Sequence, residues 1–419
     1  MDRREFRFRR NFWVYQFAAS CCLISAMETS LLTEEFASSS LRDIQQKAKA
    51  IAEAVAAPRA QEVDELQVWP AHSMDALGKA GLLGLHVPKR LGGLGQGLMG
   101  LIAVTEQLGQ ACSSSSMCFG MHSVGTAVIA AKSTPHHEAT YLSSIAKGEH
   151  ITTLALSETG SGVHFYLPNT ELRQTENGYE VSGTKQWVTN AGHAHSYVVS
   201  CKSAGDDAQY GEFTCVVVDA DSAGCHLQNA WGGFGMRGND SRPVRFENTP
   251  VSETGLLGNE GDQIWYVFEV VAPYFLTAMA GTYLGIAQAA FDIAVARVRS
   301  REYLPMQESL ADAPVIQYKI AELWSTVEQA RQMVYRAARL GDASDPNALT
   351  AIFMSKAVAG EAAVNVCNEA MTLCGGSGYG ENGKLPRLLR DARASHVMAP
   401  TTNILKLWAG RSVLGLPIL

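Results

Sequence analysis

The sequence lacks the two glycine motifs that most often bind nucleotide phosphates. No GxGxxG follows an expected strand, and no GxxxxGK followed by Ser or Thr occurs in the 419 residues. Both motifs work by letting bare glycine backbone approach a phosphate at the start of a helix. The first absence argues against a Rossmann dinucleotide site, and the second argues against a P-loop.

An excess of positive charge is also missing. The chain has 34 lysines and arginines against 41 acidic residues, which gives a formal net charge of -7. Nucleic acid as the main partner would call for a basic patch. We therefore expect no nucleic-acid partner.

Cysteine pairs of the metal-binding or disulfide type are absent as well. Nine cysteines occur, but none forms a CxxC pair or lies beside closely spaced histidines. This pattern is typical of reduced cysteines that pack in the core of a cytoplasmic protein. We expect no metal site.

A membrane-spanning segment is not expected either. The apolar run from Phe12 to Met27 follows five arginines and is shorter than the roughly twenty apolar residues that a span needs. Residues 1–30 form either a signal or organellar leader or the translation of an upstream misassigned start, with Met27 as the true start. We exclude this segment from the fold prediction.

Apolar residues make up 47% of the chain, which is ordinary for a globular protein, and the length favours two or three domains. Residues 31–150 are expected to form a helical domain. A serine run can cap a helix over 41–57, and the small residues 112–116 are expected to join helices near 100–110 and 125–131.

The period of the sequence changes at Ile151, and residues 151–258 are expected to form a β domain, either a sandwich or a barrel. The clearest signal is a hairpin between residues 171 and 181, with Asn177-Gly178 as its turn. From residue 259 to 419 long amphipathic stretches return, which indicates an antiparallel helical bundle. The fold class is therefore α+β.

Four stretches resemble motifs of one family. Residues 155–162 read ALSETGSG and are similar to (T/S)EPGAGSD, and residues 183–190 read GTKQWVTN and are similar to GxKxWITN. Residues 235–242 read GMRGNDSR and are similar to GMRGSDTR, while residues 375–406 are similar to a motif that begins GGxGY and ends in YEGTSEI. In this order and spacing they resemble the acyl-CoA dehydrogenase family of FAD flavoproteins over residues 40–406.

The resemblance implies an N-terminal α-helical domain, a central β domain and a C-terminal four-helix bundle in a dimer or tetramer. FAD would lie between the β domain and the bundle and reach a neighbouring subunit. The residues that it implies as cofactor-binding are Ser157, Trp187, Thr189, Arg301, Gly375, Gly376 and Thr401.

Physical chemistry gives most of these residues a role. The hydroxyls of Ser157 and Thr189 can hydrogen-bond the polar edge of the flavin, and Trp187 offers a flat surface beside its ring. The two glycines would let the pyrophosphate lie against bare backbone, and Arg301 could pair with it from the adjoining subunit. The alternative for each residue is an ordinary structural role.

The sequence departs from the family pattern at the catalytic base. Aligning the closing stretch places Ala399 where the family has the glutamate that takes the α-proton. Some subgroups carry the glutamate on the first bundle helix, and that position falls near Phe275. Val163 and His164 also replace the serine and aspartate of GAGSD. Because alanine cannot accept a proton, His396, three residues before Ala399, is the candidate base, and His164 is a second histidine expected near the cofactor.

Three functions remain open from the sequence. The first is α,β-dehydrogenation of an acyl thioester with FAD and an atypical base or an unusually acidic substrate. The second is a flavin-dependent monooxygenase or oxidase, for which FMN is possible in place of FAD. The third is a non-catalytic relative. The electron acceptor is expected to be either another flavoprotein or O₂.

Overall fold

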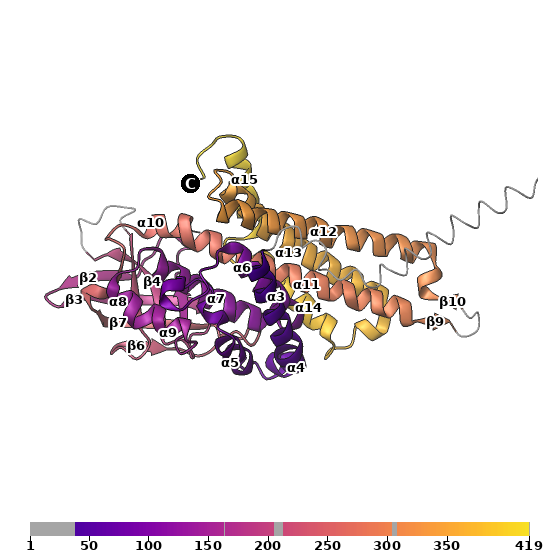
Figure 1. The fold of residues 1–419 in the computed structure, drawn as a ribbon, viewed down its shortest axis with the longest axis horizontal. Helices are drawn as coiled ribbons and strands as arrows, with labels where there is room; N and C mark the ends of the chain where they lie inside the picture. The colour runs from indigo at the N-terminus through magenta and orange to yellow at the C-terminus, as the bar shows by residue number, and fades with distance from the viewer. Residues whose placement is uncertain (1–37, 163, 205–212, 304–307, 419) are drawn as a thin grey trace, which may run out of the picture. The chain divides into compact units, whose positions relative to one another are not determined.

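The computed structural model describes residues 38–162, 164–204, 213–303 and 308–418 (Figure 1). The expected leader and Val163 therefore lie outside the described residues. The chain divides into two compact units, Met1–Asp43 and Ile44–Leu419. Of the first unit only the beginning of helix α3 (Ser39–Ile51) is described, and the second unit contains the sheet, the remaining helices and the candidate site.

The first half of this second unit is helical up to Ala146. Its main helices are α4 (Ala57–Glu65), α5 (Ala71–Lys79), α6 (Leu98–Ala111) and α7 (Ser113–Ala131), followed by the short helices α8 (Pro135–His137) and α9 (Ser143–Ala146). Helices α6 and α7 are almost entirely buried, because their leucine, isoleucine, methionine and small residues leave no polar face.

One sequence expectation about this region is wrong. The serines of residues 113–116 do not join two helices, because they form the first turn of α7. Two of their hydroxyls donate to partners inside the protein: Ser115 Oγ donates to Ser73 Oγ at 3.0 Å, and Ser116 Oγ donates to the carbonyl oxygen of Thr105 at 2.9 Å. Buried serines are tolerated where such bonds replace water.

The described residues of the central region form one sheet of eight strands. The strands are β1 (Thr152–Ala155), β2 (Glu171–Thr175), β3 (Gly178–Val188), β4 (Ser196–Ser203), β5 (Phe213–Asp219), β6 (Cys225–Leu227), β7 (Arg242–Val251) and β8 (Leu256–Leu257). They pair in the order β6-β7-β3-β2-β4-β5-β8, with β1 parallel to β4. Val181, Val199, Val216 and Phe246, from four strands, share one core, so the sheet folds over itself.

The expected hairpin is present, but its turn lies one residue earlier. Thr175 pairs with Gly178, so the two turn residues are Glu176 and Asn177. Gly178 is already the first residue of β3 and has φ +125. A side chain there would meet the carbonyl oxygen of Val251 at 2.5 Å, which explains the glycine.

The second half is a helical bundle. Its helices are α10 (Gln263–Tyr266), α11 (Ala272–Ser300), α12 (Pro314–Asp342), α13 (Ala348–Cys374), α14 (Lys384–Val397) and α15 (Thr402–Val413). Helices α11, α12 and α13 pack side by side (Figure 1). A buried ion pair between Arg331 of α12 and Glu106 of α6 joins the bundle to the N-terminal helices. The N-terminal helical, middle β and C-terminal helical arrangement expected from the sequence is confirmed.

Two stretches of the described residues, Gln263–Ser300 and Ala348–Gly378, are long and apolar enough to cross a membrane. Their most apolar windows are 89% and 61% buried inside the protein. Packing against other helices accounts for such apolar composition in a core helix, and two such helices are weak evidence for a membrane span.

Candidate active site

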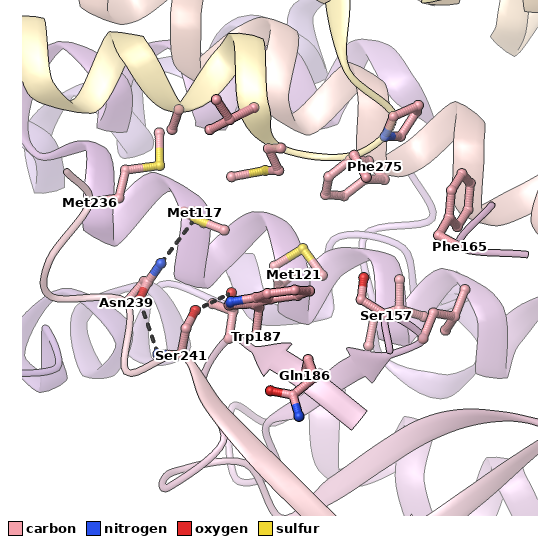
Figure 2. A pocket seen from close by; sticks show the side chains of 18 of the residues that line it. Met117, Met121, Ser157, Phe165, Gln186, Trp187, Met236, Asn239, Ser241 and Phe275 are labelled. Atoms are coloured by element: carbon pink, nitrogen blue, oxygen red, sulfur yellow. Dashed lines mark hydrogen bonds between the residues drawn. The ribbon is translucent and has the colours of Figure 1, made fainter. Parts of the chain in front are cut away.

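A cavity of about 750 Å³ lies where the β region, helix α7 and the bundle meet (Figure 2). Its walls come from α7, the ends of β1 and β3 with the residues that follow them, the segment 231–241, the start of α11, and the second half of α14 with residues 398–401. Most of the lining is apolar, and Trp231 and Phe234 at the edge are 52% and 68% exposed. This size and lining are those of a small-molecule or cofactor site.

Trp187 is held in an unusual conformation at this cavity. The pairing of β3 with β7 shifts register between Lys185 and Val188, and Trp187 has φ +52. A bulge of this kind turns a side chain away from the sheet. The indole is 50% exposed and lies along the cavity, near Met121 and Ser241 (Figure 2). A backbone held in a rarely occupied region is a mark of functional sites.

Two hydroxyl groups face the same cavity. Thr189 is buried, and its Oγ1 lies 3.2 Å from Ser241 Oγ, while its carbonyl oxygen accepts a hydrogen bond from Thr153. Ser157 is fixed through its backbone, because its carbonyl oxygen accepts from the amide of Gln186 at 2.7 Å. Among the described residues its own hydroxyl has no hydrogen-bond partner. A ligand with polar edge atoms can therefore bond here.

A buried ion pair holds the two residues on either side of Ser157. Lys185 Nζ donates to Glu158 Oε1 at 2.5 Å and to the carbonyl oxygen of Leu156 at 3.2 Å. Glu158 also accepts from the amide and hydroxyl of Thr170. Burial acts to raise the pKa of Glu158, but the charge of Lys185 and these hydrogen bonds bring the pKa below its ordinary value. Glu158 is therefore an ionised structural group.

The two positions at which the sequence comparison predicts the family's glutamate both line the cavity. They are Ala399, in the segment after α14, and Phe275, in the first turn of α11. Among the described lining residues the only carboxylate is Glu158, which is already paired. The cavity therefore holds no free carboxylate that could take a proton, within the part of the chain that the structure describes.

The two histidines singled out in the sequence are not among the lining residues. His396 Nδ1 lies 2.9 Å from Ser395 Oγ, and burial followed by the charge of Arg393 lowers its pKa. His164 is exposed, and its Nδ1 lies 2.7 Å from the hydroxyl of Tyr166. A base role for His396 stays a prediction without a contact that supports it.

The expected cofactor residues fall into two groups. Ser157, Trp187, Thr189 and Thr401 line the cavity, whereas Arg301, Gly375 and Gly376 do not. The part of α13 from Lys356, which contacts residues 395–400, to Cys374 spans roughly 27 Å at 1.5 Å per residue.

The second group lies at the other end of the bundle. Arg301 caps the end of α11, and the charge of Arg297 on that helix acts on the Cys374 thiol at the end of α13. A side chain at Gly375, with φ +60, or at Gly376 would meet no atom within 4 Å. The open backbone of these two glycines, at the far end of the bundle, is therefore separate from the cavity of the same chain.

Several cavity residues were not predicted from the sequence. Asn239 and Ser241 lie within a recognised motif, but their hydrogen bond to each other and the contact of Asn239 Nδ2 with Met117 Sδ at 3.4 Å need the fold (Figure 2). Met117 and Met121 lie one turn apart on α7, a spacing that indicates a shared face but not what it faces. Arg393 also lines the cavity, is exposed, and has no partner among the described residues.

Three family models match the chain in order. The acyl-CoA dehydrogenase N-terminal domain matches residues 38–149, the middle domain matches residues 153–249, and the C-terminal domain matches residues 276–414. Together they cover most of the chain.

Individual relatives agree with these matches. The chain is 27% identical over 377 residues to a probable acyl-CoA dehydrogenase, YngJ, of Bacillus subtilis, covering 88% of this chain and 97% of that protein. It is 29% identical over 362 residues to cyclohex-1-ene-1-carbonyl-CoA dehydrogenase of Geobacter metallireducens, covering 85% and 93%. The structure of butyryl-CoA dehydrogenase from Megasphaera elsdenii matches with a TM-score of 0.85 at 22% identity, over 90% and 99% of the two chains. The chain therefore belongs to the acyl-CoA dehydrogenase family of flavoprotein oxidoreductases that act on CH–CH groups.

Proposed function

We propose that this protein binds FAD and removes two hydrogen atoms across the Cα–Cβ bond of an acyl thioester, with no carboxylate supplied by residue 399 or 275. The observation that carries the proposal is the meeting of Ser157, Trp187, Thr189 and the segment 398–401 around one cavity. These groups come from three distant parts of the sequence.

The residues present fit a flavin. A half-exposed indole, a serine hydroxyl without a partner among the described residues, and a threonine hydroxyl with one partner match a flat ring with polar edges. Bound FAD would supply a hydride acceptor. Trp187 would lie beside the ring, while Ser157 and Thr189 would hydrogen-bond its edge.

The chain itself would leave the α-proton to another acceptor. Glu158 is already bound by Lys185 and Thr170. The two positions at which a catalytic glutamate is expected hold Ala399 and Phe275. A positioned general base is worth about 10²- to 10⁴-fold in rate. We therefore expect substrates with an unusually acidic Cα–H to be favoured, with the proton released to water at the open edge near Trp231 and Phe234.

A second candidate is an oxidase or monooxygenase of the same fold. The missing carboxylate favours it, because a reaction that does not begin by removing an α-proton has no need of that group. This candidate would use O₂ as the electron acceptor, whereas the first candidate can pass electrons to another flavoprotein.

We also propose a homo-oligomer in which Arg301, Gly375 and Gly376 contact the FAD of a neighbouring subunit. The support is their position at the opposite end of the bundle from the cavity, with bare backbone that a side chain would cover. Light scattering would give the expected dimer or tetramer. A monomer that still binds FAD tightly would contradict this assembly.

Anaerobic titration of the FAD-loaded protein tests the reaction. Butyryl-CoA, isovaleryl-CoA and a thioester with an electron-withdrawing β-substituent would be added while the flavin absorbance is followed. We expect the most acidic thioester to bleach the flavin fastest. Flavin that stays oxidised with every thioester would overturn the dehydrogenase proposal.

A further inference from the structure

Lys356 on helix α13 has a buried side chain with all three donors bound to one short segment. Its Nζ donates to the carbonyl oxygens of Ser395 at 2.7 Å, Met398 at 3.1 Å and Pro400 at 2.9 Å. The residue is 0% exposed. These acceptors lie at the end of α14 and in the segment that carries Ala399.

The acceptors explain how a cation can remain there without a carboxylate. The last carbonyls of a helix have no partner within the helix and form the negative end of its dipole. Ser395 supplies one of these carbonyls, and the segment beyond the helix supplies two more. Desolvation by burial lowers the pKa of Lys356 to about 7. Burial therefore disfavours the charged form, whereas the three carbonyl acceptors favour it.

We propose that Lys356 is a positioning residue that fixes residues 398–401 as a wall of the cavity. Met398, Ala399, Pro400 and Thr401 all line the cavity, while Lys356 itself does not. The lysine therefore acts through the segment and never touches what the cavity binds. What the cavity binds rests on the proposed function, but the fixing of the segment does not.

The same bonds orient one backbone donor. The Met398–Ala399 peptide is trans, so its carbonyl and its N–H point in opposite directions. Because the carbonyl oxygen of Met398 accepts from Lys356, the amide of Ala399 points away from the lysine. Among the described residues this amide donates to no acceptor. Lys356 thus holds a free donor within a cavity-lining residue.

Hydrogen–deuterium exchange of the protein without added thioester tests the proposal. The variants are Lys356→Met, which keeps the length and removes the donors, and Lys356→Arg, which keeps a cation. The matched control is Lys406→Met, because the one ion pair of Lys406 of the adjacent helix α15 among the described residues is an exposed pair with Glu361. The readout compares the peptide that spans residues 394–405 with a peptide from α6.

We expect Lys356→Met to speed exchange of the 394–405 peptide by about tenfold and to leave the α6 peptide unchanged. Lys356→Arg should restore part of the protection, and Lys406→Met should match the wild type. Equal acceleration in both peptides would show a merely structural lysine, and no acceleration would show that the segment is fixed without it. Either result overturns the proposal. If Lys356→Arg does not fold, the difference in exchange rate between the two peptides of Lys356→Met still tests the proposal.

A second arm measures butyryl-CoA affinity by its perturbation of the bound FAD spectrum. We expect the dissociation constant of Lys356→Met to rise about tenfold, since the wall is loosened, while Lys406→Met stays at the wild-type value. An unchanged dissociation constant despite faster local exchange would reject the functional part of the proposal. Absence of any binding in the wild type would instead reject the proposed function, and the exchange result would stand.

Discussion

Replacing Ala399 by glutamate should convert a slow dehydrogenation into a faster one. Residue 399 lines the cavity and follows Met398, whose carbonyl oxygen is fixed by Lys356. A carboxylate placed there would supply the proton acceptor that the described lining lacks. Alanine already has a Cβ atom, so the glutamate side chain would extend from that atom and the backbone would keep its path.

The expected gain follows from what a positioned base contributes. General base catalysis is worth about 10²- to 10⁴-fold, which corresponds to about 3–5 kcal/mol of activation free energy. Part of this is lost because an apolar wall raises the pKa of the new carboxyl. The guanidinium of Arg393, which also lines the cavity and has no partner among the described residues, acts to lower the pKa of that carboxyl. We therefore expect the lower end of the range, a gain of about 100-fold.

The assay is the anaerobic rate of FAD reduction by butyryl-CoA in a stopped-flow instrument. Ala399→Gln is the control, because glutamine has nearly the same shape but is not a base. Ala399→Glu should exceed both the wild type and Ala399→Gln. If all three rates are equal while FAD and butyryl-CoA bind normally, residue 399 does not face the α-carbon and the reasoning about the missing base is refuted.

Three further predictions concern single side chains. Trp187→Leu should weaken FAD binding by about fivefold, because aromatic stacking is worth about 1 kcal/mol; an unchanged affinity, measured by quenching of flavin fluorescence, would contradict its place beside the ring. Glu158→Gln should lower the free energy of unfolding by about 3–5 kcal/mol in urea, since it leaves the ammonium of its lysine partner buried without a counter-charge, and a loss below 1 kcal/mol would contradict that pairing. Acid should destabilise the protein, because burial lowers the pKa values of His86 and His122 from 6.5 to about 4. The contribution of these two histidines to the free energy of unfolding is complete above about pH 6.5 and falls by about 3 kcal/mol for each histidine by pH 4. Burial raises the pKa of Asp391 to about 6, so this residue is protonated more readily in the folded protein and offsets part of the loss. A urea midpoint that stays constant between pH 7 and pH 4 would refute this assignment.

Local patterns allowed much of the fold to be predicted from the sequence. The hairpin before Val181 follows from a turn signal between alternating residues, and the bundle follows from long amphipathic stretches with short links. The serines of residues 113–116 misled the prediction because isolated serines favour caps and turns. Inside this protein the hydroxyls of Ser115 and Ser116 bond to Ser73 and Thr105, which only tertiary structure brings near.

The site was predictable only where a motif marked it. Trp187 and Thr189 lie in a recognisable stretch, and both line the cavity. The positive φ that aims Trp187 depends on a register shift between β3 and β7, which no short pattern encodes. Lys356 gave no signal, because its acceptors are backbone carbonyls about forty residues away in the chain. The prediction of His396 rests on its sequence distance from Ala399, which does not determine the direction of its side chain.

The most direct test of the proposed reaction is the mass of the acyl thioester after a single anaerobic turnover with FAD-loaded protein, followed by a second sample exposed to O₂. We predict a product lighter than the substrate by two hydrogen atoms in both samples. A thioester that gains an oxygen atom only in the second sample, or one that is unchanged in both, would contradict the proposed dehydrogenation.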